Sequence, residues 1–459
     1  MRAETKSAGL VAQLGAAIEG GLLRPGSRLA SIRAAARERG LSKNTVAEAY
    51  ERLVAAGLLE ARRGAGYFVA TLPPRPLPRR PEVVDALNLV SLLREQTEEH
   101  YQLRPGEGRP PPSWMEESEL ARHLARAARW QHRGEAHAYG SSRGYAPLRA
   151  LLAQALTERA IPCAPDQILL TQGANHALDL IIRQMVLPGD RVLVDDPGYY
   201  PLFAKLRLAR AEIVGIRRNP DGPDIEELRT RLAERPARAF FTQSLAHNPT
   251  GGTLSPGIAR AVAALAERHG MLLVEDDAFA DLLPAPRPRL AAIAGLERVL
   301  YVGSFSKTLS ASLRVGFLAG GPPAVQALND LKLLTLVSTS QYAERLVAQL
   351  IEAGHYLRHL RRLRRRVEAA TAESLRALAE AGLAPRAPPD GGFYLWAALP
   401  AGVEEAALCR RAAPRGIFLA PGAVFAAGGR PHPPALRLNV AHAADPRFIA
   451  FLREALPPL

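Results

Sequence analysis

Cysteine is scarce in this chain, with only Cys163 and Cys409 among 459 residues. Two thiols are too few for a disulfide framework or a four-thiolate zinc site, so a reducing compartment is the default expectation. No apolar run approaches the roughly 20 residues that a membrane helix needs. The first residues also lack the basic start, apolar core and cleavage site of a signal peptide. We therefore expect a cytoplasmic protein without a membrane segment.

Two common nucleotide-binding patterns are also absent. No G-x-G-x-x-G follows a predicted strand, and no G-x-x-x-x-G-K-[ST] occurs, which removes the best sequence evidence for nicotinamide or nucleoside triphosphate sites. The histidines, among them His176 and His247, lack metal-ligand spacing. The sequence therefore gives no reason to expect a metal site.

The charge is distributed unevenly along a chain of otherwise ordinary globular composition, 47% hydrophobic and 23% charged. The formal net charge is +14, and the first 81 residues carry +8 of it, whereas the other 378 residues share +6. The length predicts two to four domains. The asymmetry predicts that an N-terminal domain binds a polyanion.

Residues 1–70 predict three helices and a β-hairpin. Apolar residues from Leu10 to Ile18 recur at helical spacing, Ser31 caps a second helix that ends at Arg39, and a third helix follows Ser42 and stops near Gly57. Two helices joined by a tight turn are typical of helix-turn-helix domains, in which the start of the second helix reaches base edges. The candidate DNA contacts at that helix start are Ser42, Lys43, Asn44 and Thr45, and those at the tip of the hairpin are Arg62 and Arg63. The alternative is a small packed domain with solvated charges.

Residues 71–98 are expected to form a linker. Its first part, TLPPRPLPRRP, holds five prolines and three arginines and favours an extended spacer. Arg75, Arg79 and Arg80 either belong to a simple tether or contact phosphates. A second proline-rich stretch, residues 104–113, precedes an expected helix over 116–130. Residues 99–459 are assigned to a large domain, with a smaller lobe from about residue 345.

From about residue 139, short apolar strands alternate with longer helical patterns, which predicts an α/β domain with a mostly parallel sheet. Ligands in such sheets lie at the carboxyl ends of the strands. Five predicted strands end in polar segments that we expect to converge on one cleft: Thr171–His176, Asp195–Tyr199, Asn248–Gly251, Glu275–Asp277 and Gly303–Lys307.

These segments contain the residue types that pyridoxal phosphate requires. Lys307 is the candidate amine for a Schiff base, and Asp276 can face the pyridine nitrogen. Tyr199 can lie on the ring, and Asn248 can donate to its phenolic oxygen. A phosphate would find backbone amides, hydroxyls and a guanidinium at the remaining candidates, which are Gly173, Ala174, Asn175, Ser304, Ser306 and Arg314.

The motifs in this chain resemble those of two protein families. Over about 60 residues, the N-terminal domain resembles the winged helix-turn-helix of GntR-family regulators, through segments that include Pro25–Leu29, Leu41–Val46, Gly57–Leu59 and Arg63–Val69. The resemblance implies that Arg33, Lys43 and Asn44 face DNA and that Thr45 lies near its backbone. Many relatives have an arginine at the position of Ala47, so a base contact is expected to be missing.

Residues from about 90 to 459 resemble fold-type I pyridoxal phosphate aminotransferases. The matching motifs are Tyr139-Gly140, Arg143-Gly144, Gly173–Asn175, Asp196–Tyr199, Asn248–Gly251, Glu275–Asp277, Ser304–Lys307, Arg314, Gly391–Phe393 and Leu436–Leu438. The resemblance implies that Arg437 binds a substrate carboxylate and that Tyr139 reaches the cofactor phosphate of the partner subunit in a homodimer. The combination of both domains matches the MocR type of GntR regulators.

Two further features stay open at this stage. Many aminotransferases have a tyrosine, a second donor to the phenolic oxygen, where this chain has Phe279; the alternative is an ordinary core aromatic. The arginine-rich run at 358–366, with leucines at 357, 360 and 363, is expected to be a solvated helix face rather than a second DNA surface.

Three functions are compatible with this reading. The favoured one is a DNA-binding transcription regulator that holds pyridoxal phosphate as an imine on Lys307 and senses an amino compound. The alternative is an active aminotransferase that transfers amino groups from amino acids to 2-oxo acids, with an accessory DNA-binding domain. A DNA-binding scaffold with a dead cofactor site is disfavoured because Lys307, Asp276, Asn248 and Arg314 are all present.

Overall fold

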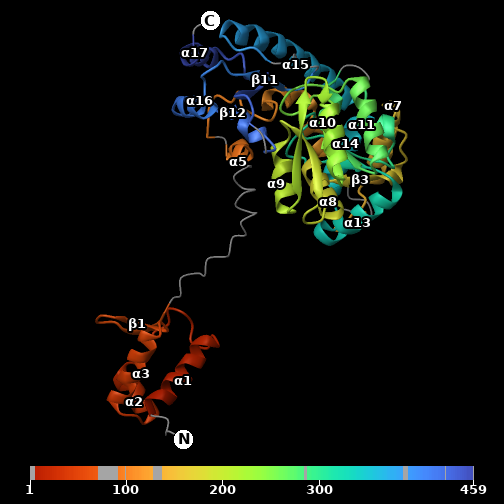
Figure 1. The fold of residues 1–459 in the computed structure, drawn as a ribbon. Coiled ribbons are helices and arrows are strands. Elements are labelled where there is room, and N and C mark those ends of the chain that lie inside the picture. Colours follow the sequence, from red (N-terminus) through yellow and green to blue (C-terminus); the bar gives the residue numbers. More distant parts are fainter. Residues whose placement is uncertain are drawn as a thin grey trace. The chain divides into compact units, whose positions relative to one another are not determined.

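The computed structural model describes residues 6–70, 91–98, 100–127, 137–283, 287–385, 391–428 and 431–457 (Figure 1). The chain divides into two compact units, Met1–Arg79 and Arg80–Leu459. Most of the expected linker, including Arg75, Arg79 and Arg80, lies outside the described residues. No helix in the described ranges is long and apolar enough to cross a membrane.

The N-terminal unit has the predicted order of three helices and a hairpin. Its elements are α1 (Lys6–Glu19), α2 (Ile32–Arg39), α3 (Lys43–Ala55), β1 (Leu59–Arg62) and β2 (Gly66–Val69). Both predicted caps are confirmed, since the Ser31 side chain accepts from the Ala34 N–H and the Ser42 side chain from the Thr45 N–H. Gly40 ends α2 with φ of 61°, a conformation that glycine adopts without strain. These local signals fix the turn between α2 and α3.

An eight-stranded sheet forms the centre of the C-terminal unit and confirms the expected, mostly parallel α/β fold. The strand order is β3-β10-β9-β8-β7-β4-β5-β6, in which β10 and the short β6 run antiparallel to their neighbours. The strands are β3 (Ile168–Thr171), β4 (Arg191–Asp196), β5 (Glu212–Asn219), β6 (Gly222–Pro223), β7 (Ala239–Thr242), β8 (Leu272–Asp276), β9 (Val299–Ser304) and β10 (Gly316–Ala319).

Helices cover both faces of this sheet (Figure 1). Strands β3, β4, β7 and β10 are buried at every residue, which is the pattern of a sheet covered on both sides. The helices around the sheet are α7 (Ala146–Glu158), α8 (Ala174–Met185), α9 (Tyr200–Leu208), α10 (Ile225–Glu234), α11 (Pro256–Arg268), α12 (Leu290–Ala294), α13 (Pro322–Leu336) and α14 (Gln341–Glu352), whereas α5 (Ser91–Glu98) lies apart from them.

A smaller lobe follows α14. It contains the antiparallel sheet β11-β13-β12, and its elements are α15 (His355–Glu380), β11 (Tyr394–Ala398), α16 (Glu405–Ala412), β12 (Ala420–Pro421), β13 (Ala435–Asn439) and α17 (Pro446–Ala455). A separate apolar core that includes Leu363, Phe393, Leu436 and Phe448 holds this lobe together.

The prediction of a helix over 116–130 is wrong for residues 116–119. The structure has a short 3-10 turn, Glu116–Ser118, and α6 begins only at Leu120 and is described to Ala127. Glu119 separates them because its φ of 60° lies in the left-handed region, where an α-helix cannot continue. Residues 128–130 lie outside the described ranges.

The arginine-rich run lies in α15, with Leu360 and Leu363 buried and Arg361 and Arg365 exposed. Leu357, expected on the same side as the other leucines, is instead 56% exposed. Three of the six arginines, Arg358, Arg361 and Arg365, are solvated as predicted, whereas the other three are half-buried.

Candidate functional site

The predicted polar segments do meet at the carboxyl edge of the large sheet. Asp276 ends β8, and Gln243 follows β7 directly. The Gln243 Nε2 donates to Asp276 Oδ2 over 2.8 Å, and the backbone N–H of Asn248 donates to Gln243 Oε1 over 2.7 Å. Gln243 thus positions both predicted residues. Sequence reasoning missed it, although its place directly after a strand was a usable signal.

Arg437 reaches this edge from β13 in the smaller lobe. It is 1% exposed, and its Nη1 donates to Asn248 Oδ1 over 3.2 Å. Its Nη2 donates to the Gly106 carbonyl over 2.7 Å, whereas its buried Nε has no partner among the described residues. A buried guanidinium with an unused N–H is a suitable anchor for a carboxylate.

The segment Pro105–Arg109 lies across the site and was not identified from the sequence, which treated it as irregular. The Gly108 carbonyl accepts hydrogen bonds from Lys307 Nζ and from the Tyr394 hydroxyl. The Asn439 side chain donates to the carbonyls of Glu107 and Arg109. This segment and β13 therefore form one wall of a cleft whose other wall is the sheet edge.

Burial shifts the pKa values of the two central charged groups. Burial, followed by the nearby Arg437, lowers the pKa of Lys307 to about 8. Burial raises the pKa of Asp276 to about 6, and the hydrogen bond from Gln243 works in the opposite direction. The second carboxylate oxygen of Asp276, Oδ1, is buried without a described partner. The lysine therefore carries a larger neutral, nucleophilic fraction near pH 7 than a free lysine would.

An anion-binding corner lies at the start of α8. Gly173 has φ of 76°, and no described side chain caps the helix, so its first N–H groups face outward. Arg314 lies beside them, donating to the Gln172 carbonyl over 2.7 Å and to the Ser306 hydroxyl over 3.3 Å. A Cβ at position 173 would lie 2.8 Å from the Arg314 guanidinium, so glycine keeps this corner open. Of the other predicted residues here, Ser304 accepts from the Ser306 N–H, and Ala174 and Asn175 form the first turn.

The three aromatic residues singled out from the sequence, Tyr199, Tyr139 and Phe279, lie in different surroundings. Tyr199 and Asp276 line the same small cavity, and burial together with Asp276 raises the pKa of the Tyr199 hydroxyl. Tyr139 is 83% exposed, and the structure of the single chain does not bring it to the cleft. Phe279 is 3% exposed and packs edge-on against Tyr394, with ring centres 5.5 Å apart.

In the N-terminal unit, Lys43 and Asn44 are exposed on the first turn of α3. Ser42 uses its hydroxyl oxygen to accept from the Thr45 N–H over 3.1 Å, so its first role is to cap the helix. Arg33 and Arg63 are exposed, and Arg62 lies over the Phe68 ring at 4.5 Å. Three of the predicted DNA contacts therefore already have side-chain partners within the domain: Ser42 and Thr45, whose hydroxyls lie 2.8 Å apart, and Arg62, which also pairs with Glu60.

The structure also brings together a group that sequence spacing did not reveal. Potential ligand atoms of Glu119, His123 and His355 lie within 4.8 Å of one another. However, an Arg358 nitrogen lies 2.7 Å from His355 Nδ1, and its permanent charge opposes a cation at that atom. We assign no metal to this cluster.

Comparison with protein families separates the same two parts. Residues 6–69 match the bacterial regulatory proteins of the gntR family, and residues 101–447 match aminotransferase class I and II. Among solved structures, the α-aminoadipate aminotransferase LysN of Thermus thermophilus, complexed with N-(5'-phosphopyridoxyl)-L-leucine, aligns with a TM-score of 0.73 at 30% identity. That alignment covers 81% of this chain and 96% of LysN.

Relatives that contain both parts are transcription regulators by name. The HTH-type transcriptional regulator YdcR of Escherichia coli is 30% identical over 437 residues, 91% of this chain and 92% of that protein. TauR of Rhodobacter capsulatus is 30% identical, over 95% of this chain and 93% of that protein. The probable rhizopine catabolism regulatory protein MocR of Rhizobium meliloti is 32% identical, over 78% and 73%. The chain therefore belongs to the GntR-type transcription regulators in which a helix-turn-helix domain precedes a class I and II aminotransferase domain.

Proposed function

We propose that this regulator binds pyridoxal phosphate covalently on Lys307 and that an amino compound bound beside the cofactor changes its binding to DNA. The observation that carries the proposal is the pair formed by Lys307, whose pKa is lowered, and Asp276, whose buried Oδ1 has no described partner. A buried carboxylate oxygen without a donor is costly. A protonated pyridine nitrogen would supply that donor.

The other residues fit the same cofactor. The first turn of α8, Arg314 and Ser306 offer N–H and O–H donors to a phosphate. Tyr199 would stack on the ring, and Asn248 would donate to the phenolic oxygen, for which its Nδ2 serves because Oδ1 already accepts from Arg437. When bound, the cofactor would supply an electrophilic carbon and an electron sink.

The proposed effector is an amino compound that also carries a carboxylate. Arg437 would hold the carboxylate through Nε and a nitrogen that now donates to Gly106. Displacing the Gly106 contact would move the segment Pro105–Arg109, which also contacts Lys307. Effector binding would thereby be coupled to the conformation of a segment close to the linker.

The direct test is a DNA-binding titration of the cofactor-loaded protein with and without amino compounds. We expect selected amino acids, but not their 2-oxo acid analogues, to change the apparent affinity for duplex DNA. Unchanged DNA binding over a wide set of amino compounds that do alter the cofactor spectrum would contradict the sensor function.

Arg437→Ala is expected to weaken binding of amino acids to the loaded protein by about 100-fold, because a buried charge-assisted pair contributes about 2–3 kcal/mol. Amines without a carboxylate should be affected much less. Absorbance titration of the bound cofactor measures both. Equal losses for the two classes would show that Arg437 does not bind the carboxylate.

Phe279→Tyr is expected to lower the imine pKa, because an added donor near the phenolic oxygen makes that oxygen less basic. The measurement is absorbance against pH, with Phe279→Leu as the control without a hydroxyl. An unchanged or raised pKa in Phe279→Tyr would show that position 279 is only a core position beside Tyr394.

A homodimer is part of the proposal. Large apolar side chains are exposed on and around α13 and α14, including Leu333 (43%), Leu334 (86%), Val337 (43%) and Tyr342 (41%). Tyr139 is a further highly exposed aromatic residue among the described residues of this unit. Such a surface favours burial against a second copy, in which Tyr139 would reach the partner's phosphate corner. Sedimentation of the full chain tests this assembly.

The second candidate function is an active aminotransferase. It is favoured by the presence of Lys307, Asp276, Asn248 and Arg437 in one cleft, and by 35% identity to the 2-aminoadipate transaminase of Thermus thermophilus over 70% of this chain and 81% of that protein. Multiple turnover with an amino acid and a 2-oxo acid would support the enzyme, whereas a single conversion without turnover would support the sensor.

A further inference from the structure

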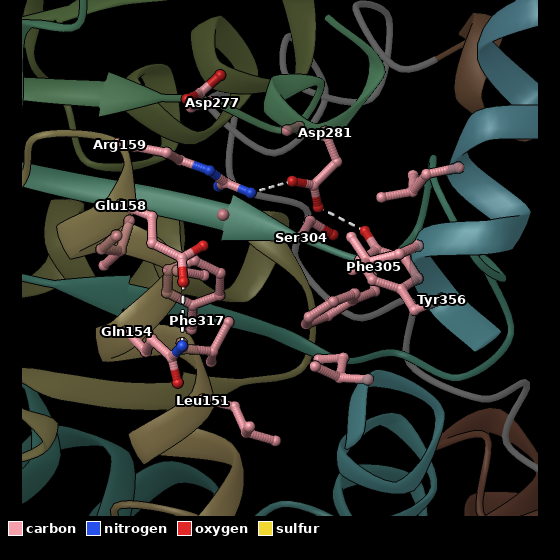
Figure 2. A pocket seen from close by; sticks show the side chains of 18 of the residues that line it. Leu151, Gln154, Glu158, Arg159, Asp277, Asp281, Ser304, Phe305, Phe317 and Tyr356 are labelled. Atoms are coloured by element: carbon pink, nitrogen blue, oxygen red, sulfur yellow. Dashed lines mark hydrogen bonds and ion pairs between the residues drawn. The ribbon is translucent and has the colours of Figure 1, made fainter. Parts of the chain in front are cut away.

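A second cavity lies between α7, the strands β9 and β10 and the start of α15 (Figure 2). Its volume is about 520 Å³, within the range of about 300–1,000 Å³ that small-molecule sites occupy. Its walls come from α7, the ends of β8 and β9, and the junction between α14 and α15. Asp276, Asn248 and Lys307 do not line it, whereas Ser304, one of the candidate phosphate residues, does.

Two consecutive residues, Asp276 and Asp277, line different cavities. Asp276 lines the small cavity that Tyr199 also lines and accepts from Gln243, whereas Asp277 lines the second cavity. The Asp277 side chain is fully buried, and its Oδ2 accepts from Arg289 Nε and from the Tyr301 hydroxyl, both over 2.7 Å. Its Oδ1 is buried without a partner among the described residues. The proposed function gives no role to this second unsatisfied carboxylate oxygen.

The remaining lining combines aromatic rings with acidic groups. The rings are Tyr301, Phe305, Phe317 and Tyr356, and the further carboxylates are Glu158, Asp281 and Glu352. Glu158 and Glu352 are exposed at the rim, and Glu158 accepts a hydrogen bond from the neutral Gln154 over 3.0 Å. Aromatic faces and carboxylates are the groups that recognise organic cations.

The positive groups of the cavity are already engaged. Arg159 pairs with Asp281, and Arg289 pairs with Asp277. Arg364 donates through two nitrogens to the Asp281 carbonyl, over 3.0 and 2.8 Å. Two aspartates thus neutralise two arginines. The two rim glutamates carry two negative charges against the one positive charge of Arg364, so the negative charges of the lining outnumber the positive ones.

We propose that this cavity binds a small protonated amine with an aromatic or aliphatic body, at a site separate from the cofactor. The amine would donate to Asp277 Oδ1, and its body would pack against Phe305 and Phe317. Asp277 adjoins Asp276, and Phe305 adjoins Ser306, which contacts Arg314. Occupancy would therefore be coupled through two chain segments to the groups proposed to hold the cofactor.

The test uses N,N-dimethylbenzylamine, which is protonated near pH 7 and, as a tertiary amine, cannot form an imine with an aldehyde. Isothermal titration of the full-length, cofactor-loaded protein is expected to show saturable binding. Ala155→Trp would fill the cavity from α7 and should weaken binding at least about tenfold, a difference of about 1.4 kcal/mol. Ala150→Trp is the matched control, since Ala150 is exposed on the same helix outside the cavity.

Further variants separate this site from the proposed cofactor site. Glu158→Gln combined with Glu352→Gln, both at the exposed rim, should weaken binding of the amine but not of its neutral isostere, isobutylbenzene. Lys307→Ala should still bind the amine saturably, with an affinity changed only by the coupling between the two sites, even if the protein proves to hold no pyridoxal phosphate. No binding, or equal binding by the Ala155→Trp and Ala150→Trp variants, would overturn the proposal.

Discussion

Lys307→Ala is expected to abolish the absorbance band of the lysine-bound cofactor and to reduce the pyridoxal phosphate retained after gel filtration at least about tenfold. The reason is that the side chain supplies the only covalent link in the proposed site, and its pKa of about 8 leaves it partly neutral at physiological pH. A colourless wild-type protein would refute the cofactor proposal outright.

The chain offers a sharp control because it has only five lysines, Lys6, Lys43, Lys205, Lys307 and Lys332. Lys205→Ala should retain the band. Lys332 is the more serious competitor, since burial lowers its pKa to about 8 as well. Its Nζ, however, already donates to the carbonyls of Ser142 and Leu170 and to Thr339. Borohydride reduction followed by peptide mass spectrometry should find the cofactor on Lys307; finding it on Lys332 would overturn the assignment.

The Lys43→Ala, Asn44→Ala double variant is expected to lose about 100-fold or more in affinity for duplex DNA. A lost base contact costs about 1–3 kcal/mol, and a lost phosphate contact lowers the salt slope by about one. Both side chains are exposed on the first turn of α3, and neither contributes to the cap, so the fold should remain intact. Fluorescence anisotropy with duplexes selected from a random pool, repeated over a range of salt concentrations, measures both effects.

Arg52→Ala is the control for charge alone, because Arg52 is exposed in the last turn of the same helix. It should change affinity much less. If the Arg52→Ala loss equals that of the double variant, the start of α3 does not enter the groove, and the interaction is general attraction to a polyanion.

Local features of the sequence were sufficient to predict several elements. Ser31 and Ser42 cap the helices they were expected to cap, since a cap depends only on residues within one turn. The five predicted strands are all present, because each is an apolar run bounded by polar or turn-forming residues. The expected start of a helix at residue 116 was wrong because the left-handed conformation of Glu119 leaves no clear signal in its neighbourhood.

Contacts between distant segments could not be predicted in this way. The pairing of Gln243 with Asp276, of Arg437 with Asn248, and of Lys307 with Gly108 joins residues 33, 189 and 199 positions apart. Nothing in the local pattern around Gly108 indicates that its carbonyl meets the lysine that follows β9. The three-residue cluster of Glu119, His123 and His355 was missed for the same reason.

The sequence by itself determined the two-part organisation, the helix-turn-helix elements, the α/β class and most of the polar residues at the strand ends, because periodicity, caps and turns act over a few residues. Only the tertiary structure decided which oxygens of Asp276 and Asp277 lack partners and that the two carboxylates line separate sites. The physical reason is that Asp276 ends β8 and Asp277 is the first residue beyond it, and the groups that each one meets are brought there by segments far away in the chain.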